Sequence, residues 1–134
     1  MGNAQFTHIN FQDMQELIKT PQKVFIINTL PDHEQDCLIC NTLPFHSEVS
    51  KINQCLNQRQ SMNLPMLVVY GKNYADTTVS TKVKQLLALG FPQVYVYAGG
   101  LFEWLMMQDI FGVEEFPTTK KELNFIRYRP QSGL

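Results

Sequence analysis

The sequence predicts an α/β fold, a three-layer sandwich around a mostly parallel central sheet. Two observations lead to this prediction. Short apolar runs at residues 24–27, 66–70 and 94–97 have the length and composition of strands, and they alternate with segments of helical periodicity. The first run is apolar at every position, which is typical of a strand buried on both faces of a parallel sheet.

Three helices are expected between and beside these strands. The first is expected over residues 11–19, where Asn10 can act as its N-terminal cap. Ser47 is expected to cap a second helix, whose apolar side chains recur at helical spacing. A third is expected over about 77–89, and Gly90 ends it as a C-terminal cap. These helices would form the outer layers of the sandwich.

The remaining segments are interpreted from their composition. Residues 28–45 resemble a loop, in which only the run 37–40 has the character of a further strand. Residues 58–63 form a polar linker, and two glycines at 99–100 turn the chain into a short last helix. The methionines at 106–107 in this helix are expected to fill the core, with an exposed adhesive patch as the alternative.

Length and composition limit the classes of function. The chain has 134 residues, enough for one domain with a real core. Its net charge of −1 at pH 7 gives no reason to expect a nucleic-acid partner or an acidic membrane. No apolar run approaches the roughly 20 residues that span a bilayer. Three cysteines do not suggest an extracellular disulfide framework, so a reducing intracellular compartment, cytoplasmic or organellar, is expected.

The N-terminus carries one potential lipid signal. Gly2 follows Met1, as N-myristoylation requires, but the usual motif has Ser or Thr at position 6, where this chain has Phe6. Residues 1–12 are polar and not basic, so no signal peptide is expected. We favour an unmodified start and keep myristoylation of Gly2 as the alternative.

The character of the sequence changes near residue 117, which suggests a domain over residues 1–117 and a basic C-terminal tail over residues 118–134. The tail combines cations with aromatic side chains, which are enriched at protein interfaces. Its candidate partner-binding residues are Lys120, Lys121, Phe125, Arg127, Tyr128 and Arg129. The alternative is a tail packed on its own domain.

The most distinctive feature follows the strand at 66–70. The strand stops at Gly71, a short polar loop follows, and a helical pattern begins behind Asp76. A helix N-terminus placed in this way can hold an anion, and enzymes with this layout often carry a cysteine nucleophile where the strand ends. The candidate site comprises Gly71, Lys72, Asn73, Tyr74, Ala75, Asp76, Thr77 and Thr78, and none of these is a cysteine.

Two interpretations of this loop remain open. In the first, backbone N–H groups and Lys72 retain an anion pocket. In the second, which we favour, Asp76 repels an anion and caps the helix itself, while Tyr74 packs into or over the vacant pocket. Neither Thr77 nor Thr78 replaces the missing thiol, because a hydroxyl needs an adjacent base and none is evident.

In their order and spacing, several segments resemble those of a single rhodanese domain. The matching segments are residues 6–9 at the family's opening, 25–28 where the family reads I-D-x-R, 38–44 against H-I-x-G-A-x-N-I-P, 68–70 in the strand before the active loop, 89–95 against x-G-F-x-x-V-Y, and 99–104 against G-G-x-x-x-W. The likeness covers roughly residues 6–117. It implies the same kind of α/β sandwich.

The departures from the family pattern concern the catalytic centre. The family's catalytic cysteine would fall at or near Gly71, the loop ends in residues 75–77 without a basic residue, and Asn28 and Leu30 stand where the family has Asp and Arg. Counted to Gly90, the loop is slightly longer than that of the sulfurtransferases and is nearer in length to that of the related cell-cycle phosphatases. The resemblance therefore implies an inactive member without a cofactor, serving protein interaction or as a structural subunit of a larger intracellular assembly.

Two other functions are kept as alternatives. A sulfurtransferase or phosphatase relative could use a displaced cysteine if Cys37 or Cys40 reached the loop. A small zinc-binding domain could use His33, Cys37, Cys40 and His46, which are ligand types that zinc prefers. Because this cluster is compressed into one segment and the run 37–40 has the character of core, structural thiols are the favoured interpretation.

Overall fold

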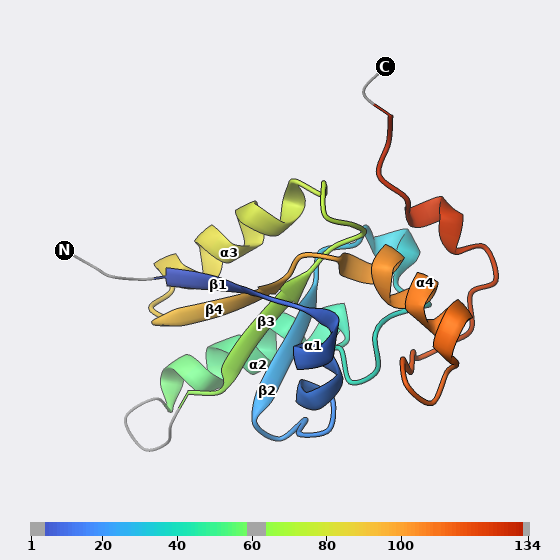
Figure 1. Ribbon diagram of the computed structural model, residues 1–134. Coiled ribbons are helices and arrows are strands. Elements are labelled where there is room, and N and C mark those ends of the chain that lie inside the picture. The colour runs from blue at the N-terminus through green and yellow to red at the C-terminus, as the bar shows by residue number, and fades with distance from the viewer. Residues whose placement is uncertain (1–4, 59–63, 133–134) are drawn as a thin grey trace.

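The computed structural model describes residues 5–58 and 64–132 (Figure 1). Gly2 and the linker residues 59–63 lie outside this part of the chain. The described helices and strands are β1 (Gln5–Ile9), α1 (Phe11–Leu17), β2 (Val24–Asn28), the 3-10 helix η1 (Asp32–Glu34), α2 (Phe45–Asn57), β3 (Met66–Tyr70), α3 (Thr78–Ala88), β4 (Gln93–Tyr97), α4 (Gly100–Phe111) and the 3-10 helix η2 (Phe125–Tyr128). The alternation of strands and helices confirms the predicted α/β class.

The described strands form one sheet in the order β1-β4-β3-β2, and every neighbouring pair is parallel. The register pairs Asn28 with Tyr70 and Ile9 with Tyr97, so the carboxyl ends of the strands meet at one edge of the sheet. Ligand sites of parallel α/β sheets usually lie outside this edge. The loop that follows β3 therefore begins where a functional site is expected.

Helices cover both faces of the sheet (Figure 1). One hydrophobic cluster lies between the sheet and the helices α1 and α4, and a second lies between the sheet and the helices α2 and α3. Successive strand residues alternate between them: Val24, Ile26 and Val68 belong to the first cluster, and Ile27 and Val69 belong to the second. This division confirms the three-layer sandwich and the strand buried on both faces.

The first helix begins at the predicted cap, and the second does not. Asn10 Oδ1 accepts the backbone N–H of Asp13 at 2.9 Å, and Asp13 Oδ2 accepts the N–H of Asn10 at 3.1 Å. In contrast, α2 starts at Phe45 behind Pro44, and the hydroxyl of Ser47 donates to the carbonyl of Pro44 inside the first turn. The fixed φ of proline already suits a helix start, so the prediction of a Ser47 cap is wrong.

The last two α-helices end at glycines. Gly90 follows α3 with a φ of 107°, and its N–H donates to the carbonyl of Leu87 at 3.1 Å, as the sequence predicts. Gly112 follows α4 with a φ of 102°. Among the described residues, no helix is both long enough and apolar enough to cross a membrane.

Two segments depart from the predicted elements. Residues 37–40 form no strand, because Ile39 makes only an isolated antiparallel bridge to Thr118. The edge strand β1 is absent from the sequence prediction. Its Phe6 and His8 side chains are exposed, so the segment lacks the apolar pattern of a buried strand.

Candidate functional site

The loop between β3 and α3 is filled by its own carboxylate. Asp76 Oδ2 accepts the backbone N–H of Lys72 at 2.8 Å. Asp76 Oδ1 accepts the N–H of Thr78 at 3.0 Å and the Thr78 hydroxyl at 2.6 Å. Both oxygens are therefore engaged inside the loop, in positions where a bound anion would otherwise receive these N–H groups. This geometry supports the self-capped loop over a retained anion pocket.

Gly71, the position to which the resemblance to rhodanese domains assigns a catalytic cysteine, has no room for a side chain. A Cβ added at Gly71 would overlap the Asp76 carboxylate and would lie 2.7 Å from Val79 Cγ2. Real Cβ contacts are essentially never shorter than about 3 Å, so a cysteine would require Asp76 and α3 to shift. Gly71 is thus part of a packed arrangement in which the Asp76 carboxylate takes the place of a side chain at position 71.

The backbone of the loop is docked on the first turn of α4. The N–H of Leu101 donates to the carbonyl of Gly71 at 2.9 Å, and the N–H of Phe102 donates to the carbonyl of Lys72 at 2.8 Å. These bonds satisfy donors that a helix N-terminus leaves unpaired. Gly100 makes the contact possible: its φ is 70°, and an added Cβ would lie 2.7 Å from the Gly71 carbonyl oxygen and 2.8 Å from Asn73 N.

Side chains fasten the loop to three neighbouring segments. Lys72 Nζ lies 3.1 Å from Glu34 Oε2 of η1, and Asn73 Nδ2 donates to the carbonyl of Tyr128 in the tail at 2.8 Å. The hydroxyl of Thr78 lies 2.8 Å from that of Thr29. The charge of Lys72, which the anion-pocket interpretation needs, is therefore already paired within the protein.

Two details of the predicted loop are wrong. Tyr74 is 75% exposed and does not pack into the loop, because Asp76 already occupies that space. Thr78 does have a carboxylate beside its hydroxyl, at 2.6 Å. That carboxylate also accepts two backbone N–H groups, which is the bonding of a structural cap rather than of a base that accepts a proton during catalysis.

The cysteines lie apart from this loop. Cys37 Sγ donates to the carbonyl of Lys120 at 3.2 Å, and burial raises the pKa of the Cys37 thiol, which opposes formation of a thiolate. Cys40 is half-buried and lines a different hollow, beside Glu16 and Lys19 of the α1 region. Burial also raises the pKa of Cys55, which belongs to the core cluster under α2.

The residues of the zinc alternative are not gathered. Across residues 5–58 and 64–132, no group of three His, Cys, Asp or Glu side chains is arranged to hold a metal ion. Cys37 lies beneath the tail and Cys40 lies beside α1, whereas His46 stacks edge-on against Phe45 in the first turn of α2. His33 lines the same hollow as Cys37 without the other two. The short spacing in sequence therefore does not become proximity in space.

A buried tyrosine ties the segment 37–42 to the sheet. Tyr70, at the end of β3, is fully buried, and its hydroxyl accepts the N–H of Ile39 at 3.1 Å and lies 2.8 Å from Thr42 Oγ1. Burial strongly raises the pKa of this phenol. The same burial keeps Tyr70 in its neutral, hydrogen-bonding form, so its role is structural.

The tail packs on the domain instead of extending from it. The N–H of Thr119 donates to the carbonyl of Leu38 at 2.8 Å, and Tyr128 is only 2% exposed, in the same cluster as Trp104. Tyr128 therefore joins the tail to the core, as in the alternative interpretation of a tail packed on its own domain. Tyr128 cannot meet a partner unless it leaves the core, which corrects its assignment as a partner-binding residue.

The other predicted tail residues divide into engaged and exposed side chains. Phe125 packs against Phe102 of α4, with ring centroids 5.9 Å apart. Arg127 Nη1 lies 3.0 Å from Glu122 Oε1, and its Nη2 lies 3.7 Å from Glu34 Oε1, the same carboxylate that pairs with Lys72. Arg129 Nη1 donates to the carbonyl of Ile126 at 3.0 Å. Lys120, Lys121, Arg127 and Arg129 are all exposed, so these four cations remain candidates for contact with a partner.

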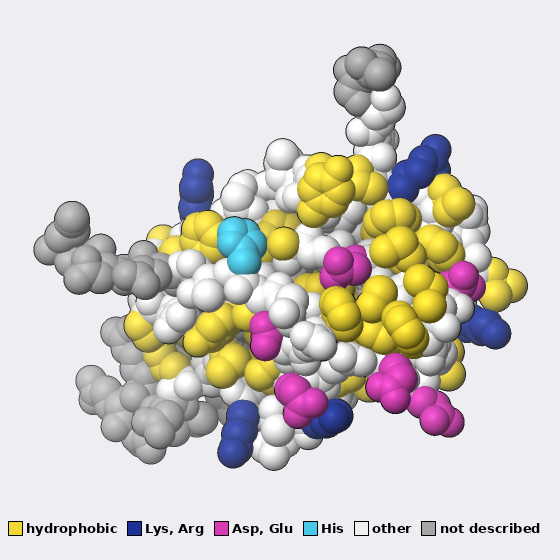
Figure 2. All heavy atoms as spheres, viewed as in Figure 1, with side chains coloured by type: hydrophobic (Ala, Val, Ile, Leu, Met, Phe, Trp, Pro, Cys, Tyr) yellow, Lys and Arg dark blue, Asp and Glu magenta, His cyan; other side chains and the backbone are white. Residues whose placement is uncertain are grey.

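Apolar side chains are exposed where α4 ends and the tail crosses it. Ile110 is 63% exposed, Val113 53%, Leu123 82% and Ile126 51%. Val113 and Leu123 line one groove together with Lys121. We call these five residues the α4–tail face. Figure 2 shows apolar side chains gathered over α4 and the tail, bordered by both acidic and cationic side chains.

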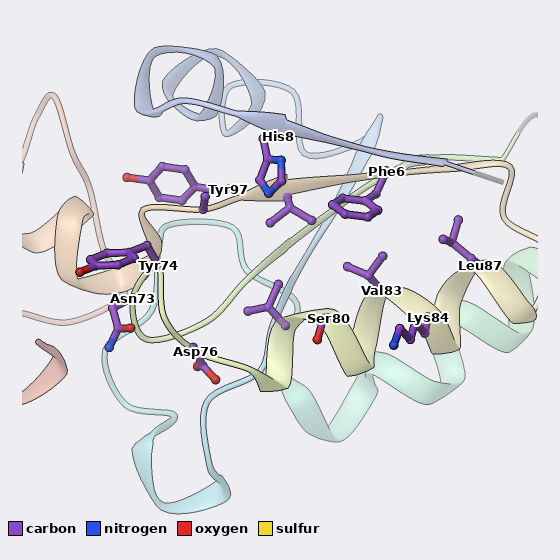
Figure 3. Close-up of a pocket in the computed structure, with 13 residues that line it drawn as sticks. Phe6, His8, Asn73, Tyr74, Asp76, Ser80, Val83, Lys84, Leu87 and Tyr97 are labelled. Atoms are coloured by element: carbon purple, nitrogen blue, oxygen red, sulfur yellow. The ribbon is translucent and has the colours of Figure 1, made fainter. Parts of the chain in front are cut away.

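A second hollow lies between β1 and α3, next to the loop (Figure 3). Its volume is about 260 Å³. It is lined among others by Phe6, His8, Tyr74, Val79, Val83 and Lys84. Of these six residues, only Tyr74 is among the site residues predicted from the sequence, because β1 is not predicted and the hollow depends on where that strand lies.

Comparisons with known proteins support the fold and go no further. No protein-family model matches the sequence, and no curated protein matches it. A full-length protein from Lactobacillus plantarum has a similar structure, with a TM-score of 0.52 and 20% identity over 75% of this chain and 82% of that one. A protein from Bacillus halodurans has a TM-score of 0.53 and 15% identity over 76% of this chain and 73% of that one. At such identities the likeness establishes the α/β fold alone.

Proposed function

We propose that this chain is a non-catalytic protein of the rhodanese type that acts by binding another protein. The observation that carries the proposal is the carboxylate of Asp76, which fills the loop and leaves no space for a side chain at Gly71. Enzymes of this type need a thiolate there, held by backbone N–H groups. Here the N–H of Lys72 is bonded to Asp76 instead.

The placement of the cysteines favours this proposal over an enzyme with a displaced nucleophile. Neither Cys37 nor Cys40 is among the residues that line the hollow next to the loop. A raised pKa makes Cys37 a poor nucleophile at neutral pH. Its thiol is also engaged with the carbonyl of Lys120.

The α4–tail face is the surface that we assign to the partner. A helix with apolar side chains all round is normally buried, yet α4 leaves Ile110 mostly exposed, and Val113 is exposed just behind its end. Contiguous exposed apolar side chains mark interaction sites. The groove is lined by Lys121 and also by Asp109 and Glu122, so its charge is mixed, and the matching partner is a protein that presents an apolar side chain to Val113 and Leu123.

An activity assay tests the non-catalytic half of the proposal. Purified protein is assayed for transfer of sulfur from thiosulfate to cyanide and for hydrolysis of an aryl phosphate, with Cys37→Ser and Cys40→Ser variants in parallel. We expect no turnover above the uncatalysed rate in either assay. Turnover that disappears in one of the cysteine variants would overturn this half of the proposal.

A binding experiment tests the second half of the proposal, that the α4–tail face binds a partner protein. Partners that co-purify in stoichiometric amounts are identified for the unchanged protein, and the complex is rebuilt from purified components. Leu123→Glu combined with Ile126→Glu should abolish the complex, whereas Val49→Glu, at an apolar side chain that is 68% exposed on α2, should preserve it. Equal binding by all three proteins would contradict the assignment of the face. A concentration-dependent dimer lost in the double variant would instead make a second copy the occupant.

A further inference from the structure

We propose that the hollow between β1 and α3 is a binding site for a small apolar carboxylate. It is separate from the α4–tail face and does not depend on the function proposed above. Figure 3 shows Phe6 and His8 on β1 facing Val83 and Leu87 of α3 across this space. Ser80 and Lys84 lie on the outer side of α3 in the same view.

The hollow exists because β1 is an edge strand that the neighbouring helix α3 does not cover on this face. α3 packs on β4 and β3, and its buried residue Val83 lies in the cluster with Val96 of β4. β1 continues the sheet beyond α3, so its Phe6 remains 50% exposed. An apolar ligand in the hollow would cover this ring and the exposed flank of α3, which releases water from apolar surface.

The volume limits the size of the ligand. About 260 Å³ is available, and a water molecule occupies about 30 Å³ in the liquid, so the hollow accepts roughly nine atoms of the size of oxygen or methylene carbon. This is the size of a medium-chain acid or a short aryl acid. Larger ligands would extend into solvent past Tyr74, which stands exposed at the loop end of the hollow.

The acidic and basic residues of the lining are Asp76 and Lys84, which balance in charge, so the anion is assigned to Lys84 alone. Asp76 is the acidic residue of its lining, and both of its oxygens are already bonded to the loop. Lys84 is exposed, and no ion pair is found for it among the described residues. The hydroxyl of Ser80 donates to the carbonyl of Thr77 at 3.0 Å, so the imidazole of His8 supplies the further hydrogen-bonding group. A carboxylate near Lys84 with its chain between Phe6 and Val83 satisfies both the charge and the apolar surface.

The test is a titration of the ¹⁵N-labelled protein with heptanoate, followed by amide chemical shifts. Saturable shifts are expected at β1, the first two turns of α3 and residues 96–98, with a dissociation constant below about 1 mM, which is within the free energy that a ligand of this size can reach. Heptanamide, which has the same chain without the charge, should bind about three- to fivefold more weakly. Shifts confined to other surfaces, or none, would overturn the proposal.

Three variants identify the groups responsible. Lys84→Gln should weaken heptanoate about three- to fivefold and leave heptanamide unchanged. Ser80→Trp, at an exposed position, should fill the mouth and abolish the saturable shifts for both ligands while the remaining spectrum stays folded. Lys51→Gln on α2, outside the lining, should change neither affinity. Equal loss in Lys84→Gln and Lys51→Gln, or full binding by Ser80→Trp, would contradict the site.

Discussion

The two ends of α4 differ in what covers them: the first turn is hydrogen-bonded to a loop, and the last turn is exposed. At the first turn, the N–H groups of Leu101 and Phe102 are bonded to the carbonyls of the loop after β3, and the loop holds the carboxylate of Asp76. At the last turn, Ile110 is exposed, and Leu123 of the tail is exposed beside the end of the helix. The loop at the first turn, where the resemblance to rhodanese domains implies a catalytic site, is filled by Asp76. The last turn, which an apolar helix would normally bury, is exposed. We therefore propose that a partner binds at the second end.

The largest loss of stability is expected from a variant that separates the loop after β3 from the first turn of α4. Gly100→Ala would place a Cβ against the backbone of residues 71–73 at a φ of 70°, and we expect a loss of about 4 kcal/mol in the free energy of unfolding from strain and overpacking together. Urea denaturation measures it. Gly112→Ala is the matched control, because Gly112 also has a positive φ of 102° but an added Cβ would meet nothing within 4 Å. Equal losses in the two variants would show that the loop is not docked as described.

A smaller effect is expected inside the loop. Gly71→Ala should cost about 3 kcal/mol, because the new Cβ overlaps Asp76 and crowds Val79. Asp76→Ala alone should cost about 2 kcal/mol through its lost hydrogen bonds to Lys72 and Thr78. In the double variant the overlap with the carboxylate is gone, so the total should fall short of the sum by about 1 kcal/mol or more. Strict additivity would mean that the two positions do not meet.

The buried phenol of Tyr70 should give a pH-dependent effect. Tyr70→Phe removes the acceptor of the Ile39 N–H and should cost about 2 kcal/mol at pH 7. Burial raises the pKa of Tyr70, and that of Tyr128 to about 12, above the usual value of about 10. A raised phenol pKa stabilises the folded state below pH of about 10, and this contribution is lost as the pH rises toward 12.

Denaturation curves at rising pH check this prediction. The free energy of unfolding should fall more steeply above pH of about 10 for the unchanged protein than for Tyr70→Phe. Tyr74→Phe serves as the control, because its phenol is 75% exposed and should change neither the stability nor the slope. The same slope in all three proteins would exclude a buried, neutral Tyr70.

The smallest effect on stability is expected at the α4–tail face, beside the last turn of α4. Leu123→Glu combined with Ile126→Glu should change the free energy of unfolding by no more than about 0.5 kcal/mol, because both side chains are exposed. Tyr128→Ala, in the same 3-10 helix as Ile126, should cost about 3 kcal/mol, since its ring is buried. A large loss in the double variant would mean that the face is part of the core.

The sequence predicts those parts of the fold that depend on local patterns. The strands β2, β3 and β4, the Asn10 cap and the Gly90 stop follow from apolar runs and from the backbone preferences of single residues. The edge strand β1 cannot be predicted in this way, because one of its faces is exposed and the segment lacks the apolar pattern of a buried strand. The Ser47 cap fails because Pro44, three residues earlier, already starts the helix.

The candidate site is predicted only in part, because its details depend on contacts between distant residues. The filling of the loop by Asp76 is local and follows from a carboxylate at a helix start. The burial of Tyr128, its bond to Asn73 and the pairing of Lys72 with Glu34 join segments that are far apart in sequence. The spacing of His33, Cys37, Cys40 and His46 could not show that their side chains diverge.

The closed loop is tested most directly by titrating the ¹⁵N-labelled protein with phosphate and with thiosulfate. In the unchanged protein the amides of residues 71–78 should show no saturable shifts, because the carboxylate of Asp76 already accepts the N–H groups of Lys72 and Thr78. In Asp76→Ala the same amides should respond to either anion. Saturable shifts at these amides in the unchanged protein would show an open anion cradle and contradict the account.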